Sequence, residues 1–372
     1  MASSKQLPFG TLSVTVHPTN PITSTISTVP LPESLAPNDI LIKVEACASN
    51  PKDWLHLVAT GTFLNSGDDL AGVVFAVGAA VTKFKPGDRV AAFHPMGKLY
   101  GAYAEYAIAP EHTTLHIPDT MSLEEASTIP LVSLTAALTL FRRQGYTAPW
   151  QSDAQQRNQK RPLLVYAATT SLGTYAIKLA KLAGIGPIVA IGGGSSDHLK
   201  RFLESPQDVF LDYRTGMEKL KESVKDLAEE RHLQLRNGID AFSEHESWVQ
   251  VSQMLQGPSR LSVFSGARKY DEEAIPNGVN IIYTFVGTGH EGKYRPSMPK
   301  QPSAEDAQGD VDFAGAFFVW LEEMLRQDKY SGHPFEVIPG GLNGVSEGLN
   351  RLRNGQAGGK KLVYQIRSLV RE

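Results

Sequence analysis

A run of small residues between an apolar segment and a helical segment is the part of this sequence best suited to bind phosphate. Residues 163–165 are Leu-Leu-Val, which is typical of a buried parallel strand, and residues 175–182 have the apolar spacing of a helix. The tight turn predicted between them would let backbone N–H groups approach a pyrophosphate, whose negative charge a helix N-terminus stabilises. The candidate cofactor residues of this turn are Ala168, Thr169, Thr170, Ser171 and Gly173.

The composition of this turn leaves two interpretations open. The dinucleotide-binding fingerprint has three glycines, whereas only Gly173 is present here, with Ala167, Ala168 and Ser171 as small substitutes. A strand, a turn and a helix also occur in α/β proteins that bind no nucleotide. The turn therefore predicts either a cofactor site or an ordinary α/β connection, and the flanking residues have to decide between them.

The residues after the next predicted strand bear on the choice of cofactor. Enzymes that use NAD place an Asp or Glu there to bind the ribose 2′-hydroxyl. Here residues 188–191 are followed by Gly-Gly-Gly-Ser-Ser, without an acid. Lys200 could contact the 2′-phosphate of NADPH or be an ordinary solvated lysine, and Asp197 is expected to cap the following helix. This pattern favours NADPH over NADH.

Composition excludes several classes of protein. The chain has 372 residues, a formal net charge of -3 and 41% apolar residues, which suits about two domains with full cores. No basic block indicates binding to nucleic acid or to a membrane surface, and no stretch approaches the ~20 apolar residues of a membrane helix. Cys47 is the only cysteine, which excludes an internal disulfide and a multi-cysteine zinc site. The N-terminus has no apolar signal sequence, so we expect a soluble protein of the cytoplasm.

The first third of the chain is predicted to be β-rich, and helices begin after it. The β-rich part contains three predicted strands, at residues 40–48, 72–78 and 89–93, whose short spacing suggests a small barrel. Ser122-Leu-Glu-Glu is a capping box that begins a helix, and a second helix is predicted over residues 131–141. The polar stretch 144–161 is expected to be a surface loop.

From residue 163 onward, strands and helices alternate, which is typical of a doubly wound parallel sheet. The predicted elements are strands at 163–165, 188–191, 208–211, 238–242, 261–264 and 279–284, helices at 175–182, 217–232 and 313–327, and a final strand at 361–366. We therefore predict an α/β fold. A β-rich domain at residues 1–130 would be completed by 288–372, and an inserted Rossmann domain would span 131–287.

This order of domains, together with several short motifs, resembles the medium-chain dehydrogenase/reductase superfamily. The matching motifs are Asn50-Pro-Lys-Asp-Trp, Gly67-Asp-Asp-Leu-Ala-Gly, Lys85-Pro-Gly-Asp-Arg-Val, Gly101-Ala-Tyr-Ala-Glu-Tyr and Gly358-Gly-Lys-Lys-Leu-Val. The chain is most similar to the zinc-independent fungal enoyl reductases that act in trans with polyketide synthases, the lovastatin enoyl reductase type. Phe210-Leu-Asp-Tyr-Arg and Val337-Ile-Pro-Gly-Gly-Leu carry that closer match. The resemblance implies a GroES-like catalytic domain around a Rossmann domain.

The resemblance also tests for zinc. Alcohol dehydrogenases of the superfamily bind zinc with a Cys, a His-Glu pair and a second Cys. The position of the first Cys is occupied here by Asn50, and that of the His by Asp68. The second Cys would lie near residues 130–133, where this sequence has no cysteine. Because a catalytic zinc needs three protein ligands, no metal site is predicted. Cys47 is three residues out of register and is expected to be a buried structural thiol.

The resemblance implies which residues contact NADPH and substrate, in a pocket between the domains. Besides the phosphate turn, the cofactor contacts map onto Asn50, Pro51, Lys52, Asp53, Ser195, Ser196, Asp197, His198, Tyr213, Gly358 and Gly359. The substrate contacts map onto Leu131, Ser133, Thr135, Tyr283, Thr284, Phe285, Val286 and Gly287. Thr135 is a candidate hydrogen-bond donor near the nicotinamide, or a helix threonine that bonds its own backbone.

The proton donor is left open because one residue departs from the family pattern. Related reductases have a Lys two residues after the Asp of the Asn-Pro motif, and here that residue is Leu55. Lys52, His56, a pocket tyrosine such as Tyr100, or solvent could supply the proton. The catalytic candidates are therefore Lys52, His56 and Thr135.

Three functions are compatible with these residues. The leading hypothesis is NADPH-dependent reduction of an activated C=C bond, in an enoyl thioester held by a polyketide synthase carrier protein in secondary metabolism. The second is a reductase of free enones or quinones, which would need no surface for a carrier. The third is an accessory protein that retains the fold without reductase activity, favoured by Leu55 and the glycine-poor turn. The expected partners include neither nucleic acid nor a membrane.

Overall fold

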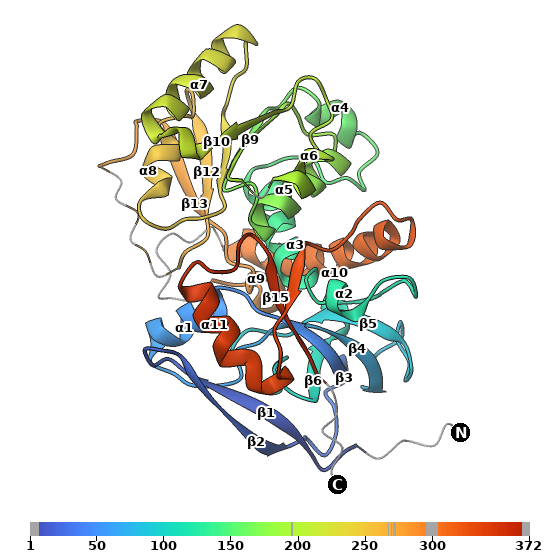
Figure 1. Cartoon of the computed structure of the whole chain (residues 1–372). Coiled ribbons are helices and arrows are strands. Elements are labelled where there is room, and N and C mark those ends of the chain that lie inside the picture. The colour runs from blue at the N-terminus through green and yellow to red at the C-terminus, as the bar shows by residue number, and fades with distance from the viewer. Residues whose placement is uncertain are drawn as a thin grey trace. The chain divides into compact units, whose positions relative to one another are not determined.

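The chain divides into two compact units, each with its own sheets. The computed structural model describes residues 7–194, 196–266, 268, 270, 273–294 and 304–366, without the side chains of 304–306 (Figure 1). Unit 1 comprises Met1–Leu131 and Asp312–Glu372, and unit 2 comprises Val132–Val311. The domain boundaries expected from the sequence stay a prediction.

Unit 1 is rich in β-structure. A two-stranded antiparallel sheet consists of β1 (Gly10–His17) and β2 (Thr23–Pro30). A seven-stranded sheet has the order β14-β15-β3-β4-β5-β7, and β6 also pairs with β3. Its strands are β3 (Asp39–Ala48), β4 (Asp69–Val77), β5 (Arg89–Phe93), β6 (Tyr106–Pro110), β7 (Thr114–His116), β14 (Phe335–Val337) and β15 (Lys361–Gln365). The strands expected at 40–48, 72–78 and 89–93 correspond to β3, β4 and β5.

Strand β3 is central to unit 1, because it pairs with β4, β6 and β15 and most of its side chains are buried. Ile40, Ile42 and Val44 belong to one core cluster with Leu70 of β4 and Leu362 of β15. The helices and 3₁₀ turns of the unit are α1 (Lys52–Thr60), η1 (Glu111–Thr113), α2 (Leu123–Ala126), η4 (Gly341–Gly344) and α11 (Val345–Arg353). The capping box is confirmed as the start of α2, since the Ser122 side chain accepts a hydrogen bond from the Glu125 N–H.

The last strand of the chain returns to unit 1. In the antiparallel pairing of β15 with β3, Val363 lies opposite Ala48, and Ala48 also lies opposite Asp69 of β4. The end of β3 is therefore flanked by the first residues of β4 and β15. This register brings together polar residues that are far apart in the sequence.

Unit 2 contains the predicted doubly wound sheet. Six parallel strands have the order β10-β9-β8-β11-β12-β13. They are β8 (Leu163–Tyr166), β9 (Ile188–Gly192), β10 (Val209–Asp212), β11 (Asn237–Asp240), β12 (Ser259–Val263) and β13 (Val279–Tyr283). The order reverses between β8 and β11, and ligands of such sheets bind at the carboxyl ends of the strands at this point.

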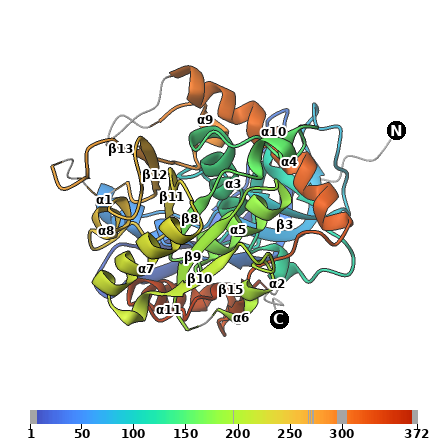
Figure 2. The same cartoon turned by 90° about the horizontal axis from the view of Figure 1, so that it is seen from above.

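Helices cover both faces of this sheet. Figure 1 shows α5 and α6 on one side of it and α7 and α8 on the other, and Figure 2 shows the strands from above. The helices of this part of the chain are α3 (Pro130–Ala137), α4 (Ala154–Asn158), α5 (Ser171–Leu182), α6 (Asp197–Lys200), α7 (Met217–Glu230), α8 (Ser247–Ser252), α9 (Thr288–Glu291) and α10 (Ala304–Arg326), with one turn at η3 (Tyr213–Thr215). Among the described residues, none of the helices has the length and apolar character needed to cross a membrane.

Three local expectations need to be corrected or refined. The helix expected over 131–141 is present, but it is α-helical only to Ala137 and continues as a π-helix, η2 (Leu138–Arg143). The stretch 144–161 is not a simple surface loop, because it contains α4 and two buried amides. Gln144 donates hydrogen bonds to the Gly238 carbonyl and to Ser262, both at 2.9 Å. Asn158 donates to the Thr147 and Ala183 carbonyls, both at 2.8 Å. Buried amides are stable when hydrogen-bonded, which a count of polar residues does not reveal.

The third correction concerns Asp197. The N-cap of α6 is Ser196, not Asp197, and its side chain makes no capping hydrogen bond. Asp197 lies in the first turn of α6 and forms an ion pair with Lys200 at 2.8 Å. A carboxylate in the first turn stabilises a helix through the helix dipole without capping it.

Candidate active site and cofactor site

The turn after β8 is shorter than the sequence suggested. Helix α5 begins at Ser171 and not after Gly173, with Thr170 as its N-cap. The Thr170 hydroxyl donates to the Ala167 carbonyl at 2.8 Å and accepts from the Gly173 N–H at 3.2 Å. Ala167 has a positive φ of 57°, where the fingerprint would have a glycine. The turn is thus made by Ala167–Thr170, and the Ala168 N–H joins it to β9 through the Ile191 carbonyl.

Gly173 allows helix α5 to pack closely against this turn. A Cβ atom at Gly173 would lie 2.5 Å from the Ala167 carbonyl oxygen and 2.6 Å from the Ala168 Cα. Both atoms belong to the backbone and cannot move aside cheaply. Glycine is therefore required here for helix–strand packing, as in the third position of a dinucleotide-binding turn.

The N-terminus of α5 has donors that could bind a phosphate. Among the residues that the structure describes, the N–H groups of Ser171 and Leu172 have no hydrogen-bond acceptor. The first N–H groups of a helix point along its axis, and the helix dipole adds positive potential. The residues present therefore fit a dinucleotide pyrophosphate, which Thr169, Thr170, Ser171 and Leu172 would hold.

The end of β9 presents glycines to the residues that follow β10. A Cβ at Gly193 would lie 3.0 Å from the Tyr213 ring, and one at Gly194 would lie 2.8 Å from Arg214 Nη1. Tyr213 and Arg214 are the last two residues of the Asp-Tyr-Arg motif. Tyr213 therefore lies beside the end of β9, and its contact with the adenosine stays a prediction. Arg214, which we did not predict, lies at the same strand end.

The other predicted residues of this edge differ in their surroundings. His198 Nε2 lies 3.1 Å from the Thr174 hydroxyl on α5, so the ring faces the neighbouring helix. Lys200 is paired with Asp197 on its own helix. Ser196 is buried, and Ser195 lies outside the described residues.

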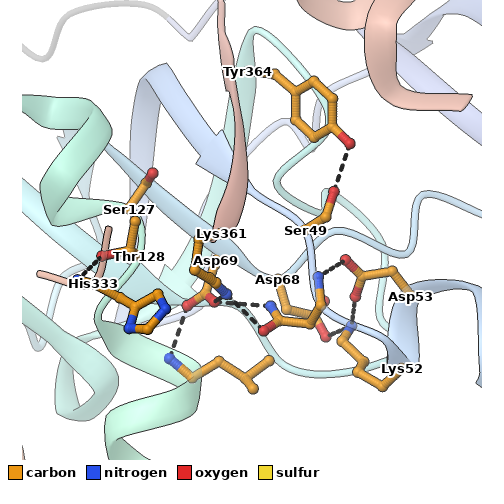
Figure 3. A network of polar contacts seen from close by, with 12 residues as sticks. Ser49, Lys52, Asp53, Asp68, Asp69, Ser127, Thr128, His333, Lys361 and Tyr364 are labelled. Atoms are coloured by element: carbon orange, nitrogen blue, oxygen red, sulfur yellow. Dashed lines mark hydrogen bonds and ion pairs between the residues drawn. The ribbon is translucent and has the colours of Figure 1, made fainter. Parts of the chain in front are cut away.

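In unit 1, Lys52 lies at the centre of a compact cluster of buried charge (Figure 3). Its ammonium group pairs with Asp68 and lies 2.8 Å from Asp53 Oδ1 and 2.6 Å from the Ser66 carbonyl oxygen. The two carboxylate side chains are 0% and 1% exposed, whereas the lysine side chain is 21% exposed. Lys52 is thus the member of this cluster that reaches solvent.

The electrostatics of this cluster favour a charged lysine. Burial alone would lower the pKa of Lys52, but Asp53 and Asp68 raise it above its usual value. Burial raises the pKa of Asp68 to about 7, against the opposing effect of Lys52. Asp68 Oδ1 has no hydrogen-bond partner within the described part of the chain. The cluster therefore holds one ammonium and a carboxyl group that changes charge near neutral pH.

A second node surrounds Lys361, the first residue of β15. Its ammonium donates to Asn50 Oδ1 at 2.7 Å and to Asp69 Oδ2 at 3.0 Å, and the Asn50 amide donates to Asp69 at 2.8 Å. Asp69 Oδ1 also accepts the Leu131 N–H at 2.8 Å, at the start of α3. Asn50 is thereby fixed in one orientation. Figure 3 shows this node beside the Lys52 cluster.

Asp53 extends the network into the core of unit 1. Its carboxylate accepts from the Asn50 N–H at 2.9 Å and from the Tyr103 hydroxyl at 2.6 Å. Tyr103 Oη also lies 3.0 Å from Ser49 Oγ, which is 2.6 Å from the Tyr364 hydroxyl. These contacts fix Asp53 in place, and so fix one of the two carboxylates that hold Lys52.

The geometry of these two nodes does not fit the catalytic zinc of alcohol dehydrogenases. Asn50 and Asp68 stand at the aligned ligand positions, and each contacts a lysine ammonium that would repel a cation. Within the described residues, no group of three or more His, Cys, Asp or Glu side chains is arranged to hold a metal ion. Cys47 is buried, and burial raises the pKa of its thiol.

The remaining predicted residues fall in both units. Pro51 is the N-cap of α1, which also carries Leu55 and the half-buried His56. Gly358 and Gly359 have positive φ values of 58° and 76° before β15. In unit 2, Ser133 and Thr135 are buried on α3, and the Thr135 carbonyl accepts from Thr139. Tyr283, Thr284, Phe285, Val286 and Gly287 form the end of β13 and the segment after it.

The sequence interpretation missed Asp69, Lys361 and Arg214 as site residues. Each is a charged residue at or near the end of an observed strand: Asp69 begins β4, Lys361 begins β15, and Arg214 follows two residues after β10. A charge next to an apolar strand was the available signal. The pairing of β3 with both β4 and β15 brings two of these residues together, and that pairing cannot be derived from local sequence.

Comparisons with known proteins agree with this fold. The family described as alcohol dehydrogenase GroES-like domain matches residues 36–119. Trans-enoyl reductase fsr4 of Gibberella fujikuroi is 32% identical over 319 residues, which cover 85% of this chain and 87% of that protein. Trans-enoyl reductase resD of Aspergillus sclerotiorum is 28% identical over an alignment that covers 91% of this chain and 95% of that protein.

Solved structures share the fold at low sequence identity. CurK enoyl reductase is 16% identical, with a TM-score of 0.68 over 96% of this chain and 99% of its own. An NAD-dependent alcohol dehydrogenase is 21% identical, with a TM-score of 0.71 over 96% of this chain and 100% of its own. Both similarities show the medium-chain dehydrogenase/reductase fold, with a GroES-like and a Rossmann part.

Proposed function

The chain belongs to the family of the fungal trans-enoyl reductases, and on this basis we propose that it uses NADPH to reduce an activated C=C bond. The substrate would be an enoyl thioester, held by a carrier protein of a polyketide synthase, in the cytoplasm. Similarity to trans-enoyl reductases over most of the chain carries this proposal. The closely packed phosphate turn supports it, with two N–H groups at the start of α5 that have no acceptor in the described part of the chain.

The bound cofactor would supply a hydride, and the chain would supply binding groups and a proton. The β-carbon of the enoyl group would accept this hydride, and the α-carbon of the resulting enolate would then take a proton. We assign this proton to the Lys52 ammonium, which is held by Asp53 and Asp68 and belongs to a side chain that is 21% exposed. The lysine amine would regain its proton from water. His56, on the same helix, is the alternative donor.

The residues that we propose for each role keep the assignments made from the sequence. The NADPH contacts are Asn50, Pro51, Lys52, Asp53, Ala168, Thr169, Thr170, Ser171, Gly173, Ser195, Ser196, Asp197, His198, Tyr213, Gly358 and Gly359. The substrate contacts are Leu131, Ser133, Thr135, Tyr283, Thr284, Phe285, Val286 and Gly287. Thr135 would donate a hydrogen bond near the nicotinamide.

The reaction would proceed without zinc, because Lys52 and Lys361 supply the positive charge next to Asp68 and Asn50. Activity should then survive long treatment with a metal chelator. A stoichiometric zinc ion whose removal abolishes turnover would refute this part of the proposal.

A panel of acceptors tests the reaction itself. NADPH oxidation should be measured with enoyl thioesters of pantetheine, with the same acyl groups on a carrier protein, and with quinones. We expect turnover with the thioesters and a higher kcat/KM with the carrier-bound forms. Turnover confined to free enones or quinones would favour the second hypothesis. Binding of NADPH without any turnover would favour an accessory protein.

A further inference from the structure

We propose that Arg214 is the residue that recognises the 2′-phosphate of NADPH and so sets the preference for NADPH over NADH. This inference rests on the proposed function, because it concerns the same dinucleotide site. It adds a residue that neither the motif pattern nor the sequence resemblance assigned.

The sheet places Arg214 next to the strand end where the adenosine ribose of a dinucleotide is bound. Strands β9 and β10 are parallel, and Asp212 pairs with Gly192. The residues after both strands therefore emerge side by side, with Gly193 and Gly194 facing Tyr213 and Arg214. In doubly wound sheets an acid at this edge binds a ribose 2′-hydroxyl, and an arginine accommodates a 2′-phosphate.

Asp212 fixes the orientation of the Arg214 guanidinium. Its carboxylate accepts the Arg214 N–H at 2.9 Å, Nε at 2.9 Å and Nη2 at 2.5 Å. Both carboxylate oxygens are thus engaged, and these hydrogen bonds lower the pKa of Asp212 to about 2. An acid used in this way is not available to hold the 2′-hydroxyl of NADH.

The opposite edge of the guanidinium faces the glycines. Nη1 lies 2.8 Å from the position that a Gly194 Cβ would occupy, so a larger residue at 194 would push the guanidinium out of this position. Nη1 has no hydrogen-bond partner among the described residues. The side chain is 59% exposed, which leaves room for a phosphate to reach it. Because a guanidinium has donors on two edges, it can hold Asp212 and a phosphate at once.

Lys200 is the competing cation at this edge and provides a matched control. It also pairs with a carboxylate, Asp197, at 2.8 Å. Its side chain is 63% exposed, close to the value of Arg214. It differs in lying on α6, whereas Arg214 Nη1 is aimed at Gly194.

Dissociation constants measured for Arg214→Gln and Lys200→Gln test this inference. The ligands are NADPH, NADH, 2′,5′-ADP and 5′-ADP, measured by calorimetry, so no turnover is needed. Loss of one charge-assisted contact should weaken NADPH and 2′,5′-ADP binding by about 10- to 100-fold. NADH and 5′-ADP should change less than about twofold. Lys200→Gln should leave all four constants within about threefold.

Gly194→Ala provides a second variant with the arginine intact. The added methyl group should displace the guanidinium and weaken 2′,5′-ADP binding by about 3- to 10-fold, again without affecting 5′-ADP.

Four outcomes would overturn the inference. If Arg214→Gln weakens NADH as much as NADPH, the residue has only a structural role. If Lys200→Gln alone removes the preference, the lysine is the recognition residue. If the parent protein binds the dinucleotides without preferring the 2′-phosphate, the inference fails and the reductase proposal stands. A parent protein that binds none of the four ligands would refute both.

Discussion

The Lys52 cluster of unit 1 consists of Lys52, Asp53 and Asp68, and the proposed phosphate edge of unit 2 consists of the start of α5, Gly193, Gly194 and Arg214. These two regions are built in opposite ways. The cluster consists of charged side chains that are buried and already paired with one another. The phosphate edge consists of backbone N–H groups, glycines and an exposed arginine, with donors that still lack acceptors among the described residues. The first arrangement is suited to holding a proton in one place. The second is suited to receiving an anion from solution.

The comparison also predicts different responses to mutation. Removing a charge from a buried pair leaves its partner unpaired, which costs stability as well as function. Changing an exposed binding group alters affinity and leaves the fold largely intact. Each prediction below tests one side of this contrast.

The largest effect is expected for Lys52→Met. If Lys52 donates the proton, turnover of an enoyl thioester should fall by about 10²- to 10⁴-fold. NADPH affinity should fall much less, because Lys52 is one of many proposed NADPH contacts. The free energy of unfolding should fall by about 3 kcal/mol, because Asp53 and Asp68 lose their cation. Steady-state kinetics, calorimetry and urea unfolding measure these quantities.

A double variant separates the two effects of that substitution. Lys52→Met with Asp68→Asn removes both charges of the Lys52–Asp68 pair, so much of the lost stability should return while turnover stays low. His56→Gln serves as the control for the alternative donor. Parental turnover in the double variant would show that Lys52 has no catalytic role.

Gly173→Val should raise the dissociation constant for NADPH by about 100-fold or more, so that binding is no longer measurable. The branched side chain would collide with the backbone at Ala167 and Ala168 and displace the start of α5. Gly315→Ala is the control, since a Cβ there meets nothing closer than 3.7 Å. Fluorescence titration gives the affinity, and circular dichroism checks the fold. Unchanged NADPH binding in a folded Gly173→Val protein would rule out this turn as the phosphate site.

These contrasts also explain which parts could be predicted from sequence. The doubly wound sheet and most strand positions followed from local apolar patterns, and the capping box located α2 within a residue. The start of α5 was misplaced because Gly173 was taken to lie in the turn, whereas its missing side chain serves packing inside the first helical turn.

The site was harder to predict because it depends on strand register. Lys361 contacts Asn50 from a position 311 residues away, through the pairing of β15 with β3. Arg214 meets Gly194 because β9 and β10 are adjacent in parallel. Local sequence gives the strands, whereas the choice of neighbours depends on the packing of the whole unit.

The pH dependence of stability provides a smaller effect. The pKa of Asp68 is about 7 in the folded protein, above the usual value of 3.8. Between these values the folded protein binds more protons than the unfolded chain, so the free energy of unfolding falls as pH rises from about 4 to 7. The slope for one group is at most about 1.4 kcal/mol per pH unit. This contribution should level off above pH 7.

Urea unfolding of the parent and of Asp68→Asn over this pH range measures that contribution. The free energy of unfolding of the parent, relative to that of Asp68→Asn, should fall as pH rises from about 4 to 7. A difference that is constant from pH 4 to 8 would mean that Asp68 does not titrate there, and that the cluster holds a fixed charge.

The smallest effect is expected for Leu55→Lys, which restores the residue of related reductases. We expect a gain in turnover of a few fold at most, because Lys52 already supplies an ammonium on the same helix. A large gain would indicate that Lys52 is only structural. Leu55→Met, which changes the shape without adding charge, controls for packing.

Isotope labelling of the product tests the reductase proposal most directly. An enoyl thioester should be incubated with the protein and NADPH deuterated at the hydride-donating carbon, and the product analysed by mass spectrometry and NMR. We predict a saturated thioester with one deuterium at the β-carbon when the reaction runs in H₂O. In D₂O the product should carry a second deuterium, taken from solvent, at the α-carbon. If the protein binds NADPH but the enoyl thioester is recovered unreduced, the account is contradicted.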